Sequence, residues 1–156
     1  MNTNIATTQD QSERLLRCGV PAESADMCYQ HIDDCVNNTD KPICNTPKEQ
    51  YNTLIGYRFG DSRIHITPAW SLSALLGFLP FKIHSDKYEY WLDVAPMDYG
   101  KQWSIGYYCM EKPRVIKGLT HTDSLIECAV QEIEWLTANG YNLNYCPCHE
   151  KGGIEQ

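Results

Sequence analysis

The sequence predicts an α+β fold: an N-terminal αα-corner, followed by an α-β-β-(β)-α unit in which two helices pack on a small antiparallel sheet. Three observations predict the second part. An apolar stretch with helical spacing ends at Leu79, and two stretches that alternate with period two follow it between residues 87 and 110. The most regular helical pattern of the chain comes last, over residues 125–136. Helices that flank a run of strands are typical of the α+β class.

The length of the chain allows one hydrophobic core. With 156 residues, of which 42% are hydrophobic and 21% charged, we expect a single globular domain over 1–156. Its parts are expected to be a frayed tail (1–8), a helical corner (9–30), an irregular insert with room for a short strand (31–66), the α+β core (67–143) and a flexible tail (144–156).

The N-terminal corner is predicted from capping and turn residues. Thr8 or Asp10 can cap a short helix over 10–18, because both side chains accept hydrogen bonds from a first helical turn. Pro21 then suits the first position of a second helix over 22–30, since it lacks the backbone N–H that a first turn leaves unpaired.

The insert is predicted from its turn residues. The segment 31–66 contains the pairs Asn-Asn, Lys-Pro and Thr-Pro, which are typical of turns and loops. Its last part, 51–66, alternates weakly between apolar and polar residues, and is therefore the place where a short strand is expected.

The next elements form the first half of the core. Ser71 can cap a helix that runs to Leu79. Residues 87–96 and 103–110 alternate in period two, and the turn residues of MDYGKQ between them predict an antiparallel hairpin. A third strand is expected around 114–117.

The last helix has a clear start and end. Thr122 or Asp123 is expected to cap it, and Asn139 with Gly140 to close it. Apolar residues recur at helical spacing over 125–136, which predicts one buried face.

Charge and hydropathy argue against two classes of partner. The formal net charge is −7, and no run of Lys or Arg offers the basic patch that nucleic acid requires, so we expect no direct nucleic-acid binding. No stretch approaches the roughly 18 apolar residues of a membrane span. The first 16 residues contain no basic segment followed by an apolar one, so we expect no secretory signal, no membrane association and a cytoplasmic protein.

Two local patterns resemble nucleic-acid-binding motifs but carry the wrong charge. The N-terminal corner has the glycine turn of a helix-turn-helix, yet its second helix would offer Glu23, Ser24 and Asp26 to phosphate. The order of the core elements resembles that of double-stranded RNA-binding domains, whose last helix begins with lysines. Here that helix begins HTDSLIE. We therefore interpret the corner as a packing element or a docking surface for protein.

Eight cysteines raise the question of a metal. In a reducing compartment they are free thiols or metal ligands rather than disulfides. Thiolates and imidazoles suit a structural zinc, which takes four ligands. The candidate ligands are Cys146, Cys148 and His149 in the tail, with Cys35 and Cys44 in the insert. The alternatives are unligated thiols in a mobile tail, or thiols with a disulfide or redox role.

Aromatic residues gather in the predicted hairpin and suggest a binding face. Trp91 and Tyr108 lie on the faces of their strands opposite to Leu92 and Ile105. If the apolar residues face the core, the two aromatic side chains face outward and form a partner-binding patch. The alternative is that they serve only as cross-strand packing pairs.

No catalytic residue is predicted. Cys109 or Cys128 could act with His121, and the pair 33–34 (Asp-Asp) with His31, but eight Cys and five His supply such combinations by chance. The motifs G-x-S-x-G, H-E-x-x-H and the P-loop are absent. We therefore expect a non-enzymatic protein. The alternative is a domain that binds zinc or a small ligand, including an enzyme of unknown reaction.

Three segments carry a family resemblance in this order: QSERLLRCGVPAESADMCY, PAWSLSALLGFLP and SLIECAVQEIEWLTANGY. Together they resemble small uncharacterised proteins of gut Bacteroidetes, found on prophages and conjugative elements. The resemblance implies a bacterial, element-associated protein and brings no catalytic residue with it. Combined with the acidic charge, it leads us to expect an accessory protein of a phage or mobile element. Such a protein would act by protein–protein binding, as an inhibitor or decoy of basic host machinery.

Overall fold

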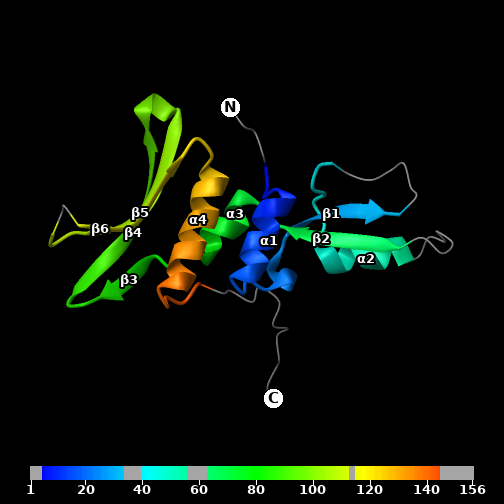
Figure 1. Ribbon diagram of the computed structural model, residues 1–156, viewed down its shortest axis with the longest axis horizontal. Coiled ribbons are helices and arrows are strands. Elements are labelled where there is room, and N and C mark those ends of the chain that lie inside the picture. Colours follow the sequence, from blue (N-terminus) through cyan, green and yellow to red (C-terminus); the bar gives the residue numbers. More distant parts are fainter. Residues whose placement is uncertain (1–4, 34–39, 56–62, 113–114, 145–156) are drawn as a thin grey trace, which may run out of the picture.

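The structure is a computed structural model that describes residues 5–33, 40–55, 63–112 and 115–144. These ranges form four α-helices and two antiparallel sheets, which places the protein in the α+β class. The larger sheet lies at one end of the molecule and a two-stranded ribbon at the other, with helices between them (Figure 1).

The elements are connected by short turns over most of the chain. In chain order they are α1 (Gln9–Arg17), the 3-10 turn η1 (Ala22–Ser24), β1 (Met27–Ile32), α2 (Pro47–Ile55), β2 (Ile64–Ala69), α3 (Leu72–Phe78), β3 (Lys82–Ser85), β4 (Tyr88–Met97), the 3-10 turn η2 (Asp98–Gly100), β5 (Gln102–Cys109), β6 (Ile116–Thr122) and α4 (Leu125–Ala138).

The first predicted helix is confirmed as α1. Thr8 is its N-cap: the Thr8 hydroxyl accepts from the backbone N–H of Gln11, and the Gln11 side chain accepts from the backbone N–H of Thr8. This reciprocal capping box satisfies two backbone donors at the start of the helix.

The predicted second helix over 22–30 is wrong, and with it the αα-corner. After Pro21 the chain makes only the turn η1 and then extends into β1. β1 pairs antiparallel with β2, in a register that places Met27 opposite Ala69. This long-range pairing supplies the backbone hydrogen bonds that a helix would otherwise supply, and it outweighs the weak local preference.

The insert over 31–66 is more regular than the sequence predicts. α2 occupies its middle, and β2 begins at Ile64, at the end of the stretch 51–66 where a strand is expected. α2 starts with a second capping box, because the Thr46 hydroxyl accepts from the N–H of Glu49 and the Glu49 side chain accepts from the N–H of Thr46. The residues TPKE carry this helix-start signal in the sequence.

The larger sheet has the strand order β3-β4-β5-β6 and is antiparallel throughout. The predicted β4–β5 hairpin is confirmed, whereas β3 was not predicted. β6 begins near the expected third strand at 114–117 and continues to Thr122. The register between β5 and β6 shifts between Ile105 and Tyr107, which places an irregularity at Gly106.

Helices α3 and α4 confirm the predicted helices of the core. Ser71 caps α3, as expected. The cap of α4 is Ser124 rather than Thr122 or Asp123, because the Ser124 hydroxyl accepts from the N–H of Glu127. Among the helices of the described ranges, none is long and apolar enough to cross a membrane, and the longest, α4, has 14 residues.

One continuous core joins the helices to one face of the larger sheet. α4 contacts β5 and β6 on one side and α1 and α3 on the other. The fully buried residues of this core include Leu15 on α1, Leu75 on α3, Ile105 and Tyr107 on β5, and Ile133 on α4. α4 therefore covers only one face of the larger sheet.

Candidate protein-docking surface

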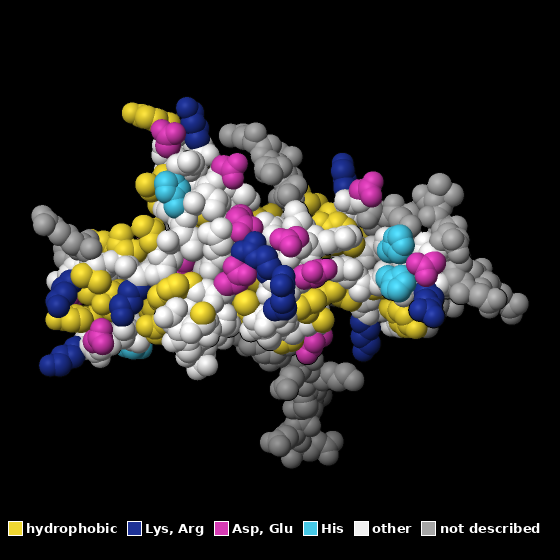
Figure 2. All heavy atoms as spheres, viewed as in Figure 1, with side chains coloured by type: hydrophobic (Ala, Val, Ile, Leu, Met, Phe, Trp, Pro, Cys, Tyr) yellow, Lys and Arg dark blue, Asp and Glu magenta, His cyan; other side chains and the backbone are white. Residues whose placement is uncertain are grey.

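The larger sheet has one covered face and one open face. Leu92 and Ile105 point toward the core, as the alternation of β4 and β5 predicts. On the opposite face, no helix from the part of the chain that the structure describes packs against the strands. In Figure 2 hydrophobic side chains gather over this end of the molecule. The open face is therefore a surface available for binding.

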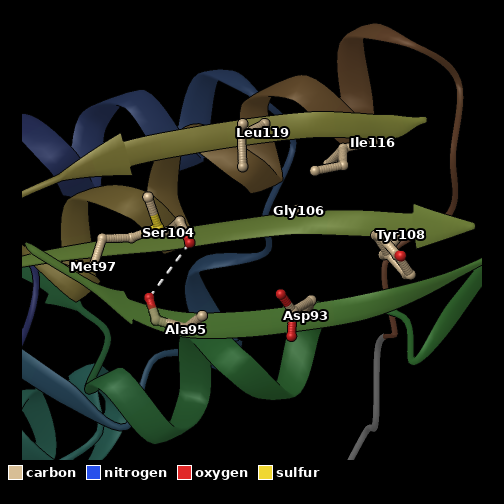
Figure 3. Close-up of a pocket in the computed structure, with 8 residues that line it drawn as sticks. All are labelled: Asp93, Ala95, Met97, Ser104, Gly106, Tyr108, Ile116 and Leu119. Carbon is tan, nitrogen blue, oxygen red and sulfur yellow. Dashed lines mark hydrogen bonds between the residues drawn. The ribbon is translucent and has the colours of Figure 1, made fainter. Parts of the chain in front are cut away.

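The open face is hollowed into a shallow groove of about 200 Å³, here called the sheet trough. Figure 3 shows the strands β4, β5 and β6 side by side beneath it. Its lining residues are Asp93, Ala95 and Met97 on β4, Ser104, Gly106 and Tyr108 on β5, and Ile116 and Leu119 on β6.

Gly106 forms the floor of the sheet trough because it carries no side chain. A Cβ atom built at Gly106 would lie 3.1 Å from Ile116 Cγ2 and 3.3 Å from the Cα atom of Leu119. A side chain at this position would require Ile116 or the backbone at Leu119 to shift by a few tenths of an ångström. A glycine within a strand often marks a close approach or a bulge, and here it marks both.

The two aromatic residues predicted to bind a partner lie next to each other on the open face. Trp91 and Tyr108 are directly opposite in the register of β4 and β5, and both are half-buried. Phe81 packs edge-on against Trp91, with ring centroids 5.2 Å apart. The ammonium group of Lys82 lies 5.6 Å from the centroid of the Trp91 ring. The same ammonium group donates a hydrogen bond to Glu89, at 3.0 Å.

Asp93 is the one acidic side chain among the residues that line the trough. It follows Trp91 on the same face of β4, lies opposite Gly106, and lines both the sheet trough and an adjoining hollow beside Trp91. Its carboxylate is exposed and has no hydrogen bond or ion pair with any described residue. Glu89 on the same face differs, because a hydrogen bond from Lys82 lowers the pKa of Glu89. Asp93 therefore remains free to receive a cation.

Apolar side chains surround this carboxylate and are unusually exposed for their size. Large exposed patches on a protein surface mark binding sites more often than chance placement does. The exposed apolar residues on or beside the open face are Phe81 (68%), Met97 (43%), Met110 (73%), Ile116 (46%) and Leu119 (60%).

Beneath the sheet, Glu132 on α4 is fully buried. Within the described part of the chain, neither of its carboxyl oxygens has a hydrogen-bond partner. Burial raises the pKa of Glu132 to about 8, because the charged form loses its hydration. Burial, together with the charge of Glu132, also raises the pKa of Tyr107 above its ordinary value. The carboxyl group therefore carries a proton at neutral pH.

The described part of the structure does not test the predicted zinc ligands. Cys35, Cys146, Cys148 and His149 lie outside the described residues. Cys44 is described and exposed. Within the described ranges, no group of three or more His, Cys, Asp or Glu side chains is arranged to hold a metal ion. A zinc site built from the five predicted residues therefore stays a prediction.

The candidate catalytic pairs have other partners. Cys128 donates through its sulfur to the backbone oxygen of Trp103, at 3.2 Å, and is fully buried. His121 is exposed, and its Nε2 lies 2.6 Å from Oε1 of Gln102. Cys109 is buried as well. These positions do not form the nucleophile–base arrangement that catalysis by cysteine requires.

Of the second candidate set, Asp34 lies outside the described residues, whereas His31 and Asp33 belong to an exposed cluster on the ribbon. His31 and His65 face each other across β1 and β2, and the Nε2 atom of each lies 3.5 Å from Oδ1 of Asp33. All three side chains are well exposed, so their mutual attraction is weak in water. His65 was not singled out from the sequence, because its position depends on the strand register.

Comparison with protein-family models, curated proteins and solved structures gives no match to this chain. The resemblance to proteins of prophages and mobile elements therefore stays a prediction. The docking surface rests on the geometry of the open face alone.

Proposed function

We propose that the protein acts without catalysis, by binding another protein through the sheet trough, and that a basic side chain of the partner is held at Asp93. The observation that carries this proposal is the position of Asp93. It is an exposed carboxylate without a partner in the described structure, set beside the Trp91–Tyr108 pair in an otherwise apolar groove.

These side chains suit a basic side chain whose charged group is attached to an apolar chain of methylene groups. A guanidinium or ammonium group over the face of Trp or Tyr gains about 0.5–2 kcal/mol. A carboxylate beside the ring adds a charge-assisted hydrogen bond, which arginine can make with two N–H groups at once. The methylene groups of the same side chain can cover the apolar walls at Ile116 and Leu119. We therefore favour arginine over lysine.

The charge of the whole chain supports the same partner class. A net charge of −7 attracts a protein with a basic surface and repels acidic ones. The exposed apolar residues around the trough supply the dry centre that protein interfaces usually have, and Asp93 supplies the specificity.

The biological role that we infer follows the expectation from the sequence. We propose an accessory protein of a phage or mobile element that works in the cytoplasm as an inhibitor or decoy. Its target would be a host protein with a basic, nucleic-acid-binding surface. The support for this role is the acidic charge and the aromatic, carboxylate-bearing trough, which would compete with nucleic acid for the same basic side chain.

A peptide selection tests the proposed function. Random peptides displayed on phage are selected on the wild-type protein and, in parallel, on Asp93→Asn and Glu13→Gln. The last variant removes one negative charge from an exposed position on α1, away from the trough. We expect peptides with an arginine next to apolar residues to be enriched on the wild type and on Glu13→Gln, but not on Asp93→Asn.

Two results would contradict the proposal. One is enrichment of peptides without any basic residue. The other is self-association: a dimer in sedimentation that Tyr108→Ala dissociates would show that a second copy of the chain occupies the open face.

A further inference from the structure

We propose that proton binding to Glu132 controls the edge of the sheet trough. The neutral carboxyl group supports β6 from beneath, and its ionisation favours opening of residues 116–119, which form one wall of the trough. The effect on partner binding rests on the proposed function, whereas the effect on β6 does not.

Glu132 is enclosed between α4 and the backbone of β6. Gly118 has a positive φ of 62° and lies so close that a Cβ atom there would collide with Oε1 of Glu132 and with the ring of Trp135. Leu119, the next residue, lines the trough and packs beside Gly106. The carboxyl group is therefore separated from the trough by one layer of backbone.

On the sheet side, no cation among the described residues neutralises this carboxyl group. Tyr107 on β5 donates its hydroxyl to the backbone oxygen of Pro80, at 2.8 Å, and so does not donate to Glu132. Lys117 on β6 directs its ammonium group to the β3–β4 turn, where it lies 3.7 Å from Oδ2 of Asp86.

On the helix side, the charged groups are also engaged elsewhere. Arg14 on α1 binds Glu127 and Glu134 on α4. The buried thiols Cys109 and Cys128 belong to the same core and are uncharged as thiols. α3, with the sequence LSALLGF, carries no titratable side chain. An ionised Glu132 thus has no counter-charge among the elements packed around it.

The segment most able to relieve this charge is β6. A buried carboxylate without donors requires water or a movement of its cover. β6 is an edge strand, hydrogen-bonded along one side only, whereas α4 is held by α1, α3 and β5. The Thr120 hydroxyl bonds the backbone oxygens of Ile105 and Cys128 and anchors the strand. Opening therefore involves the residues before it, 116–119.

Hydrogen exchange of the full chain, followed by mass spectrometry from pH 5 to pH 9, tests the structural part. After correction for the intrinsic exchange rate, the opening constant of the β6 amides should rise by up to about tenfold per pH unit until about pH 8. Amides of β4, which open only with the whole fold, should exchange more slowly than those of β6 at every pH. Glu132→Gln, a neutral isostere, should remove the dependence. Glu132→Met serves as a second neutral variant in case the glutamine variant folds poorly. Equal pH dependence in the wild type and a folded neutral variant would overturn the inference.

Binding of a capped Gly-Arg-Gly peptide, measured by NMR, tests the link to the trough. We expect its apparent affinity to fall by at least about twofold between pH 6 and pH 9 in the wild type and to stay constant in Glu132→Gln. A pH-sensitive β6 with no peptide binding at any pH would overturn the proposed function alone. Peptide binding with a pH-insensitive β6 would overturn the role of Glu132 alone. If opening of β6 depends on pH but peptide affinity does not, the proposed coupling between β6 and the sheet trough would be overturned.

Discussion

Trp91 and Tyr108 lie directly opposite each other on β4 and β5, on the face of the sheet that α4 does not cover. The next pair along the same face is Asp93 and Gly106. Along this face, the aromatic pair is thus followed by a carboxylate that lies opposite a glycine, which has no side chain. This order of side chains is the basis of our proposal that the open face binds a basic side chain.

The aromatic pair should contribute directly to binding of an arginine-containing peptide. Replacing either Trp91 or Tyr108 by Leu keeps an apolar side chain but removes the ring. Loss of a cation–π contact should weaken binding by roughly two- to thirtyfold. Tyr51→Leu is the control, because Tyr51 is exposed on α2 at the other end of the molecule. Equal affinities of the trough variants and the control would contradict the assignment.

Gly118 should not tolerate a side chain. Gly118→Ala would combine a strained positive φ with a collision against Glu132 and Trp135. We expect it to lower the free energy of unfolding by about 2–4 kcal/mol in urea denaturation. Gly140→Ala is the matched control. Gly140 also has a positive φ, of 75°, but open space around it, so only about 1 kcal/mol should be lost.

Arg14 should fasten α1 to α4. Its Nη1 lies 2.8 Å from Glu127, and its Nε and Nη2 both bind Glu134. The hydrogen bond to Glu134 is the main reason why the pKa of Arg14 is raised. Arg14→Lys keeps the charge but loses this paired geometry, so we expect a loss of about 1–2 kcal/mol.

The free energy of unfolding of Arg14→Lys, measured by chemical denaturation, can be compared with that of Arg17→Lys. Arg17 is exposed and, among the described residues, bonds only the backbone of Glu13. That control should change stability by less than about 0.5 kcal/mol. Equal losses in the two variants would show that the contact with Glu127 and Glu134 does not hold α1 in place.

Glu132 should make the protein less stable as the pH rises. Its pKa is about 8 in the folded chain and near 4.5 in the unfolded chain. Between these values the folded state holds a proton that the unfolded state has released. Stability should therefore fall by up to roughly 1.4 kcal/mol per pH unit from about pH 5 to pH 8, and level off above that.

Glu132→Gln should flatten this part of the pH profile of unfolding. Glu127 acts in the opposite direction. Although burial raises its pKa, hydrogen bonds from Gln11, Arg14 and Gln131 lower the pKa overall, so its contribution is lost as the pH falls into the acid range. A wild-type profile that matches the profile of Glu132→Gln would contradict the burial of this charge.

The sequence predicts the parts of the fold that depend on local patterns. α3 and the β4–β5 hairpin follow from a capping serine and from alternation with period two, both of which are visible within about ten residues. β1 could not be predicted in this way. Its residues carry weak local signals, and its partner β2 lies more than thirty positions further along the chain. α2 was missed although TPKE signals its start.

Local alternation also predicts part of the geometry of the candidate site. Alternation places Trp91 and Tyr108 on the outer face, where the structure has them. Asp93 shares that face by the same rule and could have been found. The sheet trough could not have been predicted from the sequence, because it depends on Gly106 and on the shifted register between β5 and β6. The burial of Glu132 could also have been predicted, since this residue falls on the apolar stripe of α4, four residues from Leu136.

The most direct test of the docking surface is an NMR titration of the wild-type protein with a capped Gly-Arg-Gly peptide, observing the indole N–H of Trp91. A capped Gly-Gln-Gly peptide and the variant Asp93→Asn serve as controls. We predict a saturable shift of the Trp91 signal with the arginine peptide, and a much smaller shift with the glutamine peptide or in Asp93→Asn. Equal shifts with both peptides, or an unchanged response in Asp93→Asn, would contradict the claim that this face recognises a basic side chain.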